Sequence, residues 1–328
     1  MTNKARPRVS ILLPVHNGAP YLKGCLDSLW AQSFEQFECL ALNDGSTDET
    51  EEILSRVRDP RLVHVPLRRC GLTKTLNTGL EMARGEFIAR QDVDDFSMPD
   101  RLKVQVRALE ASPRLTLVGS DALAINSRGR VIRKIVFPVV HREIVERLLV
   151  LNNPFAHTAI MFRKDPILRC GGYREIIFKA EDYDLYLRLS EGHELANIHK
   201  PLVKVLCSME SVSCSDQQGQ QFKSSVLALV SALSRRGHAK DPLEERDKDK
   251  FLAEFDAWYA STQYSDWFRA IKYRRQTLLA LSEGRFGPAF SSLMSSLRAH
   301  PGWLLNRAMS GSNDWMAKEA IQWAQTHT

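Results

Sequence analysis

Short apolar runs alternate with helix-periodic segments over residues 9–91, and this alternation constrains the fold more than any other feature of the sequence. Each run is too short and too weakly helix-periodic to be anything but a buried strand. The predicted strands are residues 9–15, 39–42, 61–65 and 87–89, and the predicted helices between them are residues 20–33, a segment after residue 47, and residues 72–83. Regular alternation of this kind predicts a parallel, right-handed, doubly wound α/β sheet.

The remaining chain divides into a mixed part and a helical part. The mixed part predicts a helix beginning at Pro99, a hairpin turning at 126–129, a helix at 141–151, a strand at 156–162, a helix at 181–189, and strands at 195–198 and 202–206. The helical part predicts helices at 222–234, 251–259, 267–281, 286–297 and 315–324. We therefore expect an α/β domain at 1–213, with halves at 8–112 and 113–213, and an all-helical subdomain at 214–328.

Composition excludes some partners. The net charge of +6 suits an anionic substrate or lipid, but the basic residues are spread along the chain, so we expect no nucleic acid partner. The six cysteines show no metal-binding spacing, which favours reduced thiols and a cytoplasmic protein. No apolar signal segment and no stretch near the roughly 20 apolar residues of a membrane span is seen. We expect a cytoplasmic protein that is either soluble or peripheral on the inner face of the cell membrane.

Acidic residues follow two of the predicted strands. Asp44 follows the second strand, and Asp92, Asp94 and Asp95 follow the fourth. Ligands of open α/β sheets bind outside these carboxyl ends, where Asp92 and Asp94 can point in one direction. Two carboxylates suit Mg²⁺ or Mn²⁺, which takes further ligands from water and substrate phosphates. An isolated acid-rich turn is equally well explained as a solvated loop, so the rest of the chain has to decide.

Five motifs together resemble the family 2 glycosyltransferases. They are residues 14–18, 43–48, 71–77, 89–95 with 99–101, and 180–185, in family order and at family spacing over about residues 8–213. The resemblance implies a GT-A fold, which is Rossmann-like with a mostly parallel sheet. It also implies an inverting, metal-dependent hexosyltransferase. Such an enzyme moves a sugar from a nucleotide-sugar donor, most often UDP-linked, to a glycan or lipid-linked acceptor in bacterial surface polysaccharide or lipopolysaccharide biosynthesis.

The resemblance also implies roles for particular residues. Nucleotide-sugar binding falls to Pro14, His16, Asn17, Asp44, Lys74 and Asp92. Asp94, with Asp92, would bind the Mn²⁺ or Mg²⁺ ion, and Asp182 would be the general base that activates the acceptor hydroxyl. Glu181, His157 and Arg101 would take acceptor or secondary roles, with Arg101 and Asp95 shaping the loop.

Each of these residues also has a purely structural interpretation. Asp44 can cap a local Asx-turn, and Glu181 with Asp182 can complement a helix dipole, although both roles are compatible with function. Lys74 alone would be a solvated side chain, and a lone His157 is more often structural. Ser46 or Thr47 can cap the helix that follows them.

One position departs from the family pattern. Ser208 stands where many members carry a metal-binding histidine, and Leu206 stands where they carry an arginine. Serine is a poor ligand for a divalent ion, so the departure keeps open an alternative, a non-catalytic sugar-nucleotide-binding or scaffold protein. A nucleotidyltransferase is disfavoured, because no glycine-rich basic signature follows the first strand.

The helical part interleaves aromatic and basic side chains. Core aromatics with solvated cations explain this pattern, and so does a face for peripheral membrane contact or for a homo-oligomer. The aromatic residues are Trp267, Phe268, Tyr273, Trp303, Trp315 and Trp323.

Overall fold

A computed structural model describes residues 6–207, 219–262, 286–299 and 314–327, together with the single residues 273, 276, 280 and 283. Its strands are β1 (Val9–Val15), β2 (Phe37–Asp44), β3 (Leu62–Leu67), β4 (Phe87–Arg90), β5 (Phe96–Ser97), β6 (Leu115–Ile125), β7 (Val131–Ile135), β8 (Met161–Arg163) and β9 (Glu194–Leu206). Its helices are α1 (Ala19–Trp30), α2 (Thr50–Arg56), α3 (Leu72–Met82), α4 (Arg101–Ala111), α5 (His141–Leu148), the 3₁₀ turn η1 (His157–Ala159), α6 (Lys164–Arg169), α7 (Glu181–Ser190), α9 (Gln220–Arg236), α10 (Lys248–Ser261), α12 (Phe286–Ala299) and α13 (Asp314–His327).

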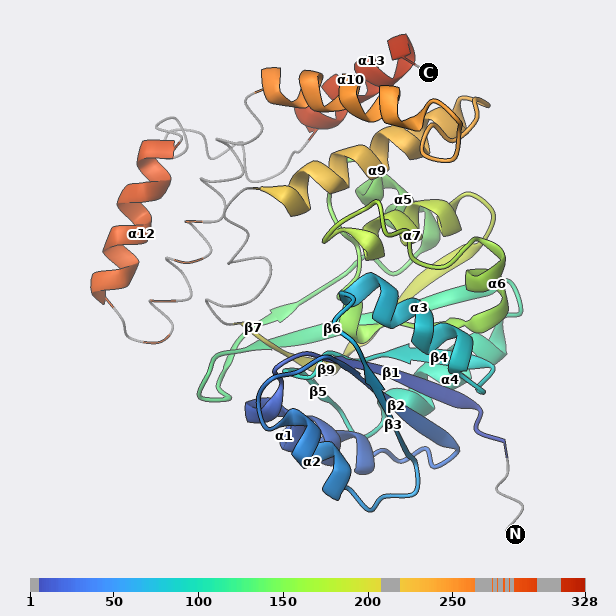
Figure 1. The fold of residues 1–328 in the computed structure, drawn as a ribbon, viewed down its shortest axis with the longest axis vertical. Coiled ribbons are helices and arrows are strands. Elements are labelled where there is room, and N and C mark those ends of the chain that lie inside the picture. The colour runs from blue at the N-terminus through green and yellow to red at the C-terminus, as the bar shows by residue number, and fades with distance from the viewer. Residues whose placement is uncertain are drawn as a thin grey trace.

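The first four strands form the parallel half of the sheet that the sequence predicts. β1 pairs in parallel with β2 and β4, and β2 pairs in parallel with β3. Successive residues of β1 enter opposite cores, because Ile11 and Leu13 pack with α1 and α2 whereas Leu12 packs with α3. Figure 1 shows α1 and α2 on one side of these strands and α3 on the other. The doubly wound arrangement is therefore confirmed.

The second half of the sheet is mixed. In the described residues the strand order is β3-β2-β1-β4-β8-β6-β9-β5, with β7 paired to β6. β8 is antiparallel to both β4 and β6 and so joins the two halves, while β6 and β9 run parallel. The predicted hairpin is confirmed as β6 and β7 around Asn126, whose side-chain oxygen accepts the N–H groups of Arg128 and Arg130.

Several predicted boundaries were wrong. The strand expected at 156–162 is the turn η1 followed by the short strand β8, and α4 begins at Arg101 rather than at Pro99. The two strands expected between 195 and 206 are one strand, β9, whose register against β6 shifts where Pro201 faces Asp121. Proline has no N–H to donate to the neighbouring strand, so the sequence around Pro201 resembles a break between two strands. The helix α6 was missed.

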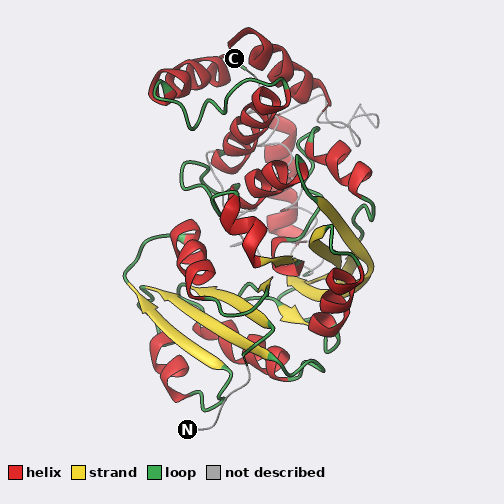
Figure 2. Cartoon of the chain, turned by 90° about the vertical axis from the view of Figure 1, so that its right-hand side faces the viewer, coloured by secondary structure: helices red, strands yellow, loops and turns green. Residues whose placement is uncertain are grey.

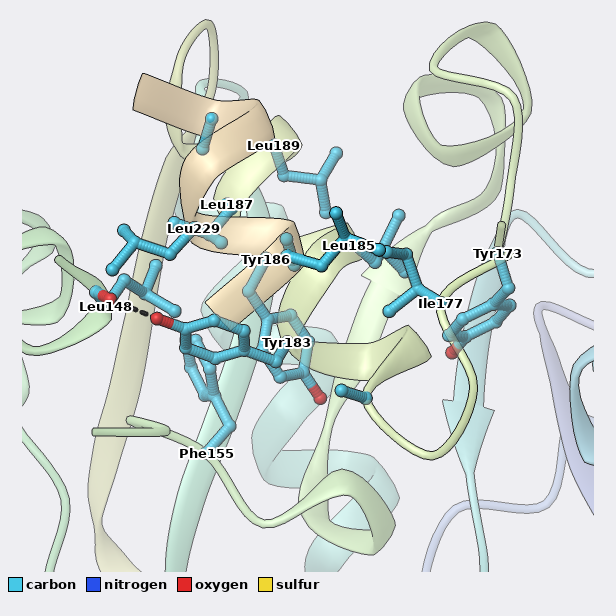
Figure 3. Close-up of a cluster of buried hydrophobic side chains, with 14 of the residues drawn as sticks. Leu148, Phe155, Tyr173, Ile177, Tyr183, Leu185, Tyr186, Leu187, Leu189 and Leu229 are labelled. Atoms are coloured by element: carbon cyan, nitrogen blue, oxygen red, sulfur yellow. Dashed lines mark hydrogen bonds between the residues drawn. The ribbon is translucent and has the colours of Figure 1, made fainter. Parts of the chain in front are cut away.

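Three of the described C-terminal helices, α9, α10 and α13, share a core with the α/β part. Tyr183 and Leu187 of α7 lie in one cluster with Leu229 of α9, as Figure 3 shows. In Figures 1 and 2 these three helices form a layer at the end of the molecule away from the N-terminus. Arg174 adds ion pairs from the loop before α7 to Asp184 and to Asp241, which follows α9. The predicted boundary at 213/214 falls in residues 208–218, outside the described residues, and stays a prediction.

The aromatic residues of this layer support the core interpretation where they are described. Trp323 is buried against Phe251, Phe255 and Trp258. Trp267, Phe268 and Trp303, and the side chain of Trp315, lie outside the described residues. Among the helices that are described, none has the length and apolarity needed to cross a bilayer.

Candidate functional site

The carboxyl ends of β1, β2 and β4 meet at one edge of the sheet, because these strands are parallel neighbours. The loop after β1 is tied to the loop after β2. His16 Nδ1 lies 2.9 Å from the carbonyl oxygen of Asp44, and the backbone N–H of Asn17 donates to Ser46 Oγ at 3.0 Å. Asn17 adopts a left-handed conformation, with φ of 51°, and its side-chain oxygen accepts the N–H of Thr47 at 2.8 Å. Pro14, just before this loop, is buried in β1.

The predicted helix cap at Ser46 or Thr47 is wrong. α2 begins after Glu49, which makes no side-chain cap bond, and the N–H of Thr50 instead donates to Asp48 Oδ1 at 3.1 Å. The long-range contacts of Ser46 and Thr47 with Asn17 outweigh the local cap.

Asp44 is a buried carboxylate that accepts three hydrogen bonds. It is only 3% exposed, and it accepts the N–H groups of Cys70 at 2.6 Å and Gly71 at 3.0 Å. Arg69 Nη1 lies 2.6 Å from its second oxygen. Burial by itself would raise the pKa of Asp44, but these donors and the Arg69 charge outweigh burial and leave the pKa lowered. Asp44 therefore stays ionised, and Arg69 is a neighbour that the sequence analysis missed.

Lys74 lies in the first turn of α3, close to this loop. Its Nζ is 3.4 Å from Glu175 Oε2, and both side chains are more than half exposed. The pair connects the first half of the sheet to the loop that precedes α7, across the site.

The acids after β4 occupy three different environments. Asp92 Oδ1 lies 2.6 Å from Arg90 Nη2. Asp94 is partly buried, and burial together with the charge of Asp92 raises its pKa to about 6. Asp95 is buried, and its Oδ1 accepts the N–H of Leu206 at 2.8 Å. This loop touches the first loop, because a Cβ on Gly18 would lie 2.9 Å from Val93 Cγ2.

Arg101 lies beneath the loop that carries Asp92, Asp94 and Asp95, called the acid loop, rather than in it. It is 1% exposed, and its guanidinium donates to the carbonyl oxygens of Arg90 and Ile160 and to the side chains of Gln91, Ser97 and Gln105. Burial lowers the pKa of Arg101 to about 9. These contacts fit the loop-shaping role and leave the side chain out of reach of an acceptor.

Glu181 and Asp182 begin α7. Asp182 Oδ2 accepts the side-chain amide of Asn153 at 2.9 Å, and its Oδ1 accepts the N–H of Tyr183 at 2.7 Å. Glu181 is buried, and burial together with the Asp182 charge raises its pKa to about 7. Burial also raises the pKa of Asp182. Glu181 therefore exchanges a proton near neutral pH, and Asp182 holds its proton to a higher pH than an ordinary aspartate does.

His157 lies in η1 and not in the strand predicted for it. Its Nε2 is 3.1 Å from the hydroxyl of Tyr173. Burial, and then the charge of Arg90, lower the pKa of His157 well below its ordinary value, so the ring is neutral.

The residues present fit a divalent cation only in part. In the described part of the chain no group of three or more His, Cys, Asp and Glu side chains could hold a metal ion. Asp92 and Asp94 do supply two hard oxygen donors, which suffice for Mg²⁺ or Mn²⁺ when substrate phosphates and water complete the shell. Ser208 lies outside the described residues.

Comparisons with known proteins decide the family. Residues 10–172 match the sequence profile described as Glycosyl transferase family 2. The amylovoran biosynthesis glycosyltransferase AmsE of Erwinia amylovora is 32% identical over 210 residues, which are 62% of this chain and 78% of that protein. The chain belongs to glycosyl transferase family 2. Another family 2 relative, the O-antigen biosynthesis glycosyltransferase WbnJ of Escherichia coli, is 31% identical over 55% of this chain and 71% of its own length.

Solved structures support the fold of this family 2 enzyme. S. aureus TarS in complex with UDP-GlcNAc aligns with a TM-score of 0.57 at 19% identity, covering 89% of this chain and 92% of its own. The mannosyltransferase PcManGT from Pyrobaculum calidifontis, in complex with GDP-Man and Mn²⁺, aligns with a TM-score of 0.55 at 18% identity, covering 98% of this chain and 86% of its own. Both neighbours have the GT-A fold, and the predicted fold class is confirmed.

The fold brings the predicted residues of the family 2 enzyme into two groups. The loops that carry His16, Asn17 and Asp44 contact each other directly. Arg90 interacts electrostatically with Glu181 and Asp182 of α7 as well as with Asp92. Arg90 was part of a quoted motif but received no role in the sequence analysis. A basic residue two positions before Asp92, at the end of an apolar strand, was the only signal for it.

Proposed function

We propose that this family 2 enzyme transfers a sugar, with inversion, from a UDP-linked donor to a hydroxyl of a glycan or lipid-linked acceptor in surface polysaccharide biosynthesis. One observation carries the proposal. Two kinds of carboxyl group share the site, because the pKa of Asp44 is lowered while the pKa values of Glu181 and Asp182 are raised. Such separation is typical of a site that binds with one acid and moves a proton with another. The relatives named for amylovoran and O-antigen biosynthesis, and TarS with UDP-GlcNAc, support the substrate class.

Donor binding falls to the first group of residues. Asp44, ionised and fixed by three donors, is placed to accept hydrogen bonds from uracil or ribose through its remaining lone pairs. Pro14, His16 and Asn17 shape the loop beside it, and Lys74 supplies a cation near the diphosphate. Arg69 can swing away from Asp44 to admit the nucleotide, since its side chain is 57% exposed.

Asp92 and Asp94 would hold the divalent cation, Mn²⁺ or Mg²⁺. When bound, the ion neutralises the charge of the departing nucleoside diphosphate. A cation there also suits the protein, because two neighbouring carboxylates otherwise repel each other and Asp94 takes up a proton too easily.

Asp182 is the proposed general base. Asn153 and the N–H of Tyr183 hold its carboxylate in one orientation. As the acceptor oxygen forms a bond to the anomeric carbon, its proton passes to Asp182. The bond from that carbon to the diphosphate oxygen breaks on the opposite face, and the diphosphate leaves with the electron pair. Attack opposite the leaving group inverts the anomeric configuration. Glu181 and His157 line the acceptor side.

The setting of the reaction follows from the acceptor. We place the enzyme in the cytoplasm, peripheral on the inner face of the membrane when the acceptor is lipid-linked. The C-terminal helices are the proposed site of that contact or of a homo-oligomer.

Release of nucleoside diphosphate from a panel of UDP- and GDP-sugars, with Mn²⁺ or with EDTA, tests the function. We expect release from one UDP-sugar that requires the metal and is lost in Asp94→Asn. Nucleotide binding without release from any donor, in the presence of glycan and lipid-linked acceptors, would instead support the non-catalytic alternative. Absence of nucleotide binding would refute both.

A further inference from the structure

Arg90 is a buried charge that is only partly neutralised. It ends β4, is 1% exposed, and uses Nη2 to hold Asp92 Oδ1 at 2.6 Å. Its other two nitrogens, Nε and Nη1, are buried without a hydrogen-bond partner among the described residues. Buried donors without partners are rare, because each one lacks the compensation that water would supply. The guanidinium therefore keeps two donors, on Nε and Nη1, that no described residue satisfies.

The groups around Arg90 belong to both halves of the enzyme. The titratable and charged side chains that face it are Asp92 and Asp94 after β4, Glu181, Asp182 and Tyr186 of α7, Tyr173 before α7, His157 of η1, and Arg101 of α4. Four of these are carboxyl groups, and Arg101 gives its donors to carbonyl and amide oxygens and to a hydroxyl. Arg90 is thus a cation that interacts both with the acids after β4 and with the acids of α7.

Arg188 shows what a purely structural arginine looks like here. It lies on α7 and is nearly as buried as Arg90, with a side chain 7% exposed. Its three nitrogens donate to Asp184 Oδ2 at 2.9 Å, to the carbonyl oxygen of Cys170 at 2.6 Å and to that of Gly172 at 2.7 Å. Every donor of Arg188 is used within the framework, whereas Arg90 uses one.

We infer that Arg90 is a positioning residue that couples the donor side of the site to the acceptor side. Through Nη2 it fixes Asp92 at the donor, and through its charge it keeps Asp182 ionised as the base. This inference rests on the proposed function, since it assigns Asp182 the role of base. An opposite charge nearby favours the ionised form of a carboxyl group, so loss of Arg90 makes Asp182 hold its proton to higher pH.

The pH dependence of kcat/KM tests the coupling, with Arg90→Gln, Arg90→Lys and the matched control Arg188→Gln. In Arg90→Gln we expect the acidic limb of the kcat/KM profile, where activity falls as the pH is lowered, to shift to a pH about one unit higher. The KM for the donor should also rise. Arg90→Lys, which keeps the charge, should restore the limb towards that of the wild type. Arg188→Gln should lower Tm without moving the limb. Coincident limbs for the wild type and Arg90→Gln would overturn the inference.

A second measurement does not need turnover. The pKa of Glu181 is raised in the folded protein, so its contribution to stability is present at low pH and is lost as the pH rises through about 7. Without Arg90 this loss of stability from Glu181 is larger, because no cation favours the ionised carboxylate. The Tm difference between wild type and Arg90→Gln should therefore grow from about pH 5 to about pH 8. A difference that is constant with pH would contradict the shared-cation role. If no donor turns over, the proposed function fails and this comparison still decides the role of Arg90.

Discussion

Asp44 and Asp182, the acids proposed to bind the nucleotide and to act as the base, have environments that shift their pKa values in opposite directions. Asp44 is held by two backbone N–H groups and by Arg69, and its pKa is lowered although it is buried. Asp182 accepts one side-chain amide and one backbone N–H, but burial outweighs these donors and the Arg90 charge, and its pKa is raised. Both groups are aspartates, so the difference lies in how far the surrounding donors and charges offset the cost of burial.

This contrast separates binding from proton transfer. A carboxylate that must accept hydrogen bonds from a nucleotide works best when it is permanently charged. A general base works best when its pKa approaches the working pH, because it must take up a proton and then release it. The loop after β3 provides the environment that keeps Asp44 charged. The start of α7 provides the environment that raises the pKa of Asp182.

Removal of the base should give the largest effect. Asp182→Asn keeps the shape but cannot take a proton, so we expect kcat to fall by about 10²–10⁴-fold with UDP affinity unchanged. Steady-state kinetics and calorimetry measure the two quantities.

Asp184→Asn is the matched control on the same helix. It weakens the ion pairs with Arg174 and Arg188, so stability should fall while kcat per folded molecule is retained. An equal fall of kcat in both variants would contradict the role of Asp182.

Lowering the pH should reduce turnover before it weakens nucleotide binding. As pH falls, Asp182 is protonated before Asp44, because its pKa is raised, and turnover decreases about tenfold per unit below that pKa. Asp44 stays ionised to a pH below the ordinary aspartate range, because its pKa is lowered. UDP affinity in EDTA should therefore persist after kcat has declined. A simultaneous loss of both would remove the distinction between the two acids.

Neutralising Asp44 should weaken binding rather than chemistry. Asp44→Asn loses the charge and one acceptor oxygen, so we expect about tenfold weaker UDP binding and a nearly unchanged kcat at saturating donor. Asp48→Asn, in the same loop, loses one acceptor oxygen and weakens the contacts of Asp48 with Ala19 and Thr50, and it should leave UDP affinity unchanged. Weaker binding in the control alone would place the nucleotide elsewhere.

The smallest effect should come from the contact between the loop after β1, at Gly18, and the acid loop after β4, at Val93. A Cβ in Gly18→Ala would lie 2.7 Å from Val15 Cγ1 and 2.9 Å from Val93 Cγ2, so the acid loop must move. We expect a severalfold higher KM for the donor and a loss of stability of about 1–3 kcal/mol.

Val93→Ala in the same chain should restore part of the loss, because it removes one of the two clashes. Gly192→Ala, where nothing lies within 4 Å of the added Cβ, should change neither quantity. No change in Gly18→Ala would show that the two loops are independent.

The sequence by itself determined the parallel half of the sheet and the places where its acids stand. β1 spans the predicted residues 9–15, because a short apolar run is a property of neighbouring residues. Asp44 ends β2 and Asp92 follows β4, so the parallel topology alone brings them to one edge.

Only the tertiary structure decided what these acids can do. The protonation of Asp182 depends on its burial, on the Asn153 side chain and on the charge of Arg90, and these two residues come from segments far from Asp182 in the sequence. His157 leaves its predicted strand for a 3₁₀ turn, where Thr158 Oγ1 accepts the N–H of Asp92. Burial and the field of distant charges set a pKa, and neither is written in the spacing of residues along the chain.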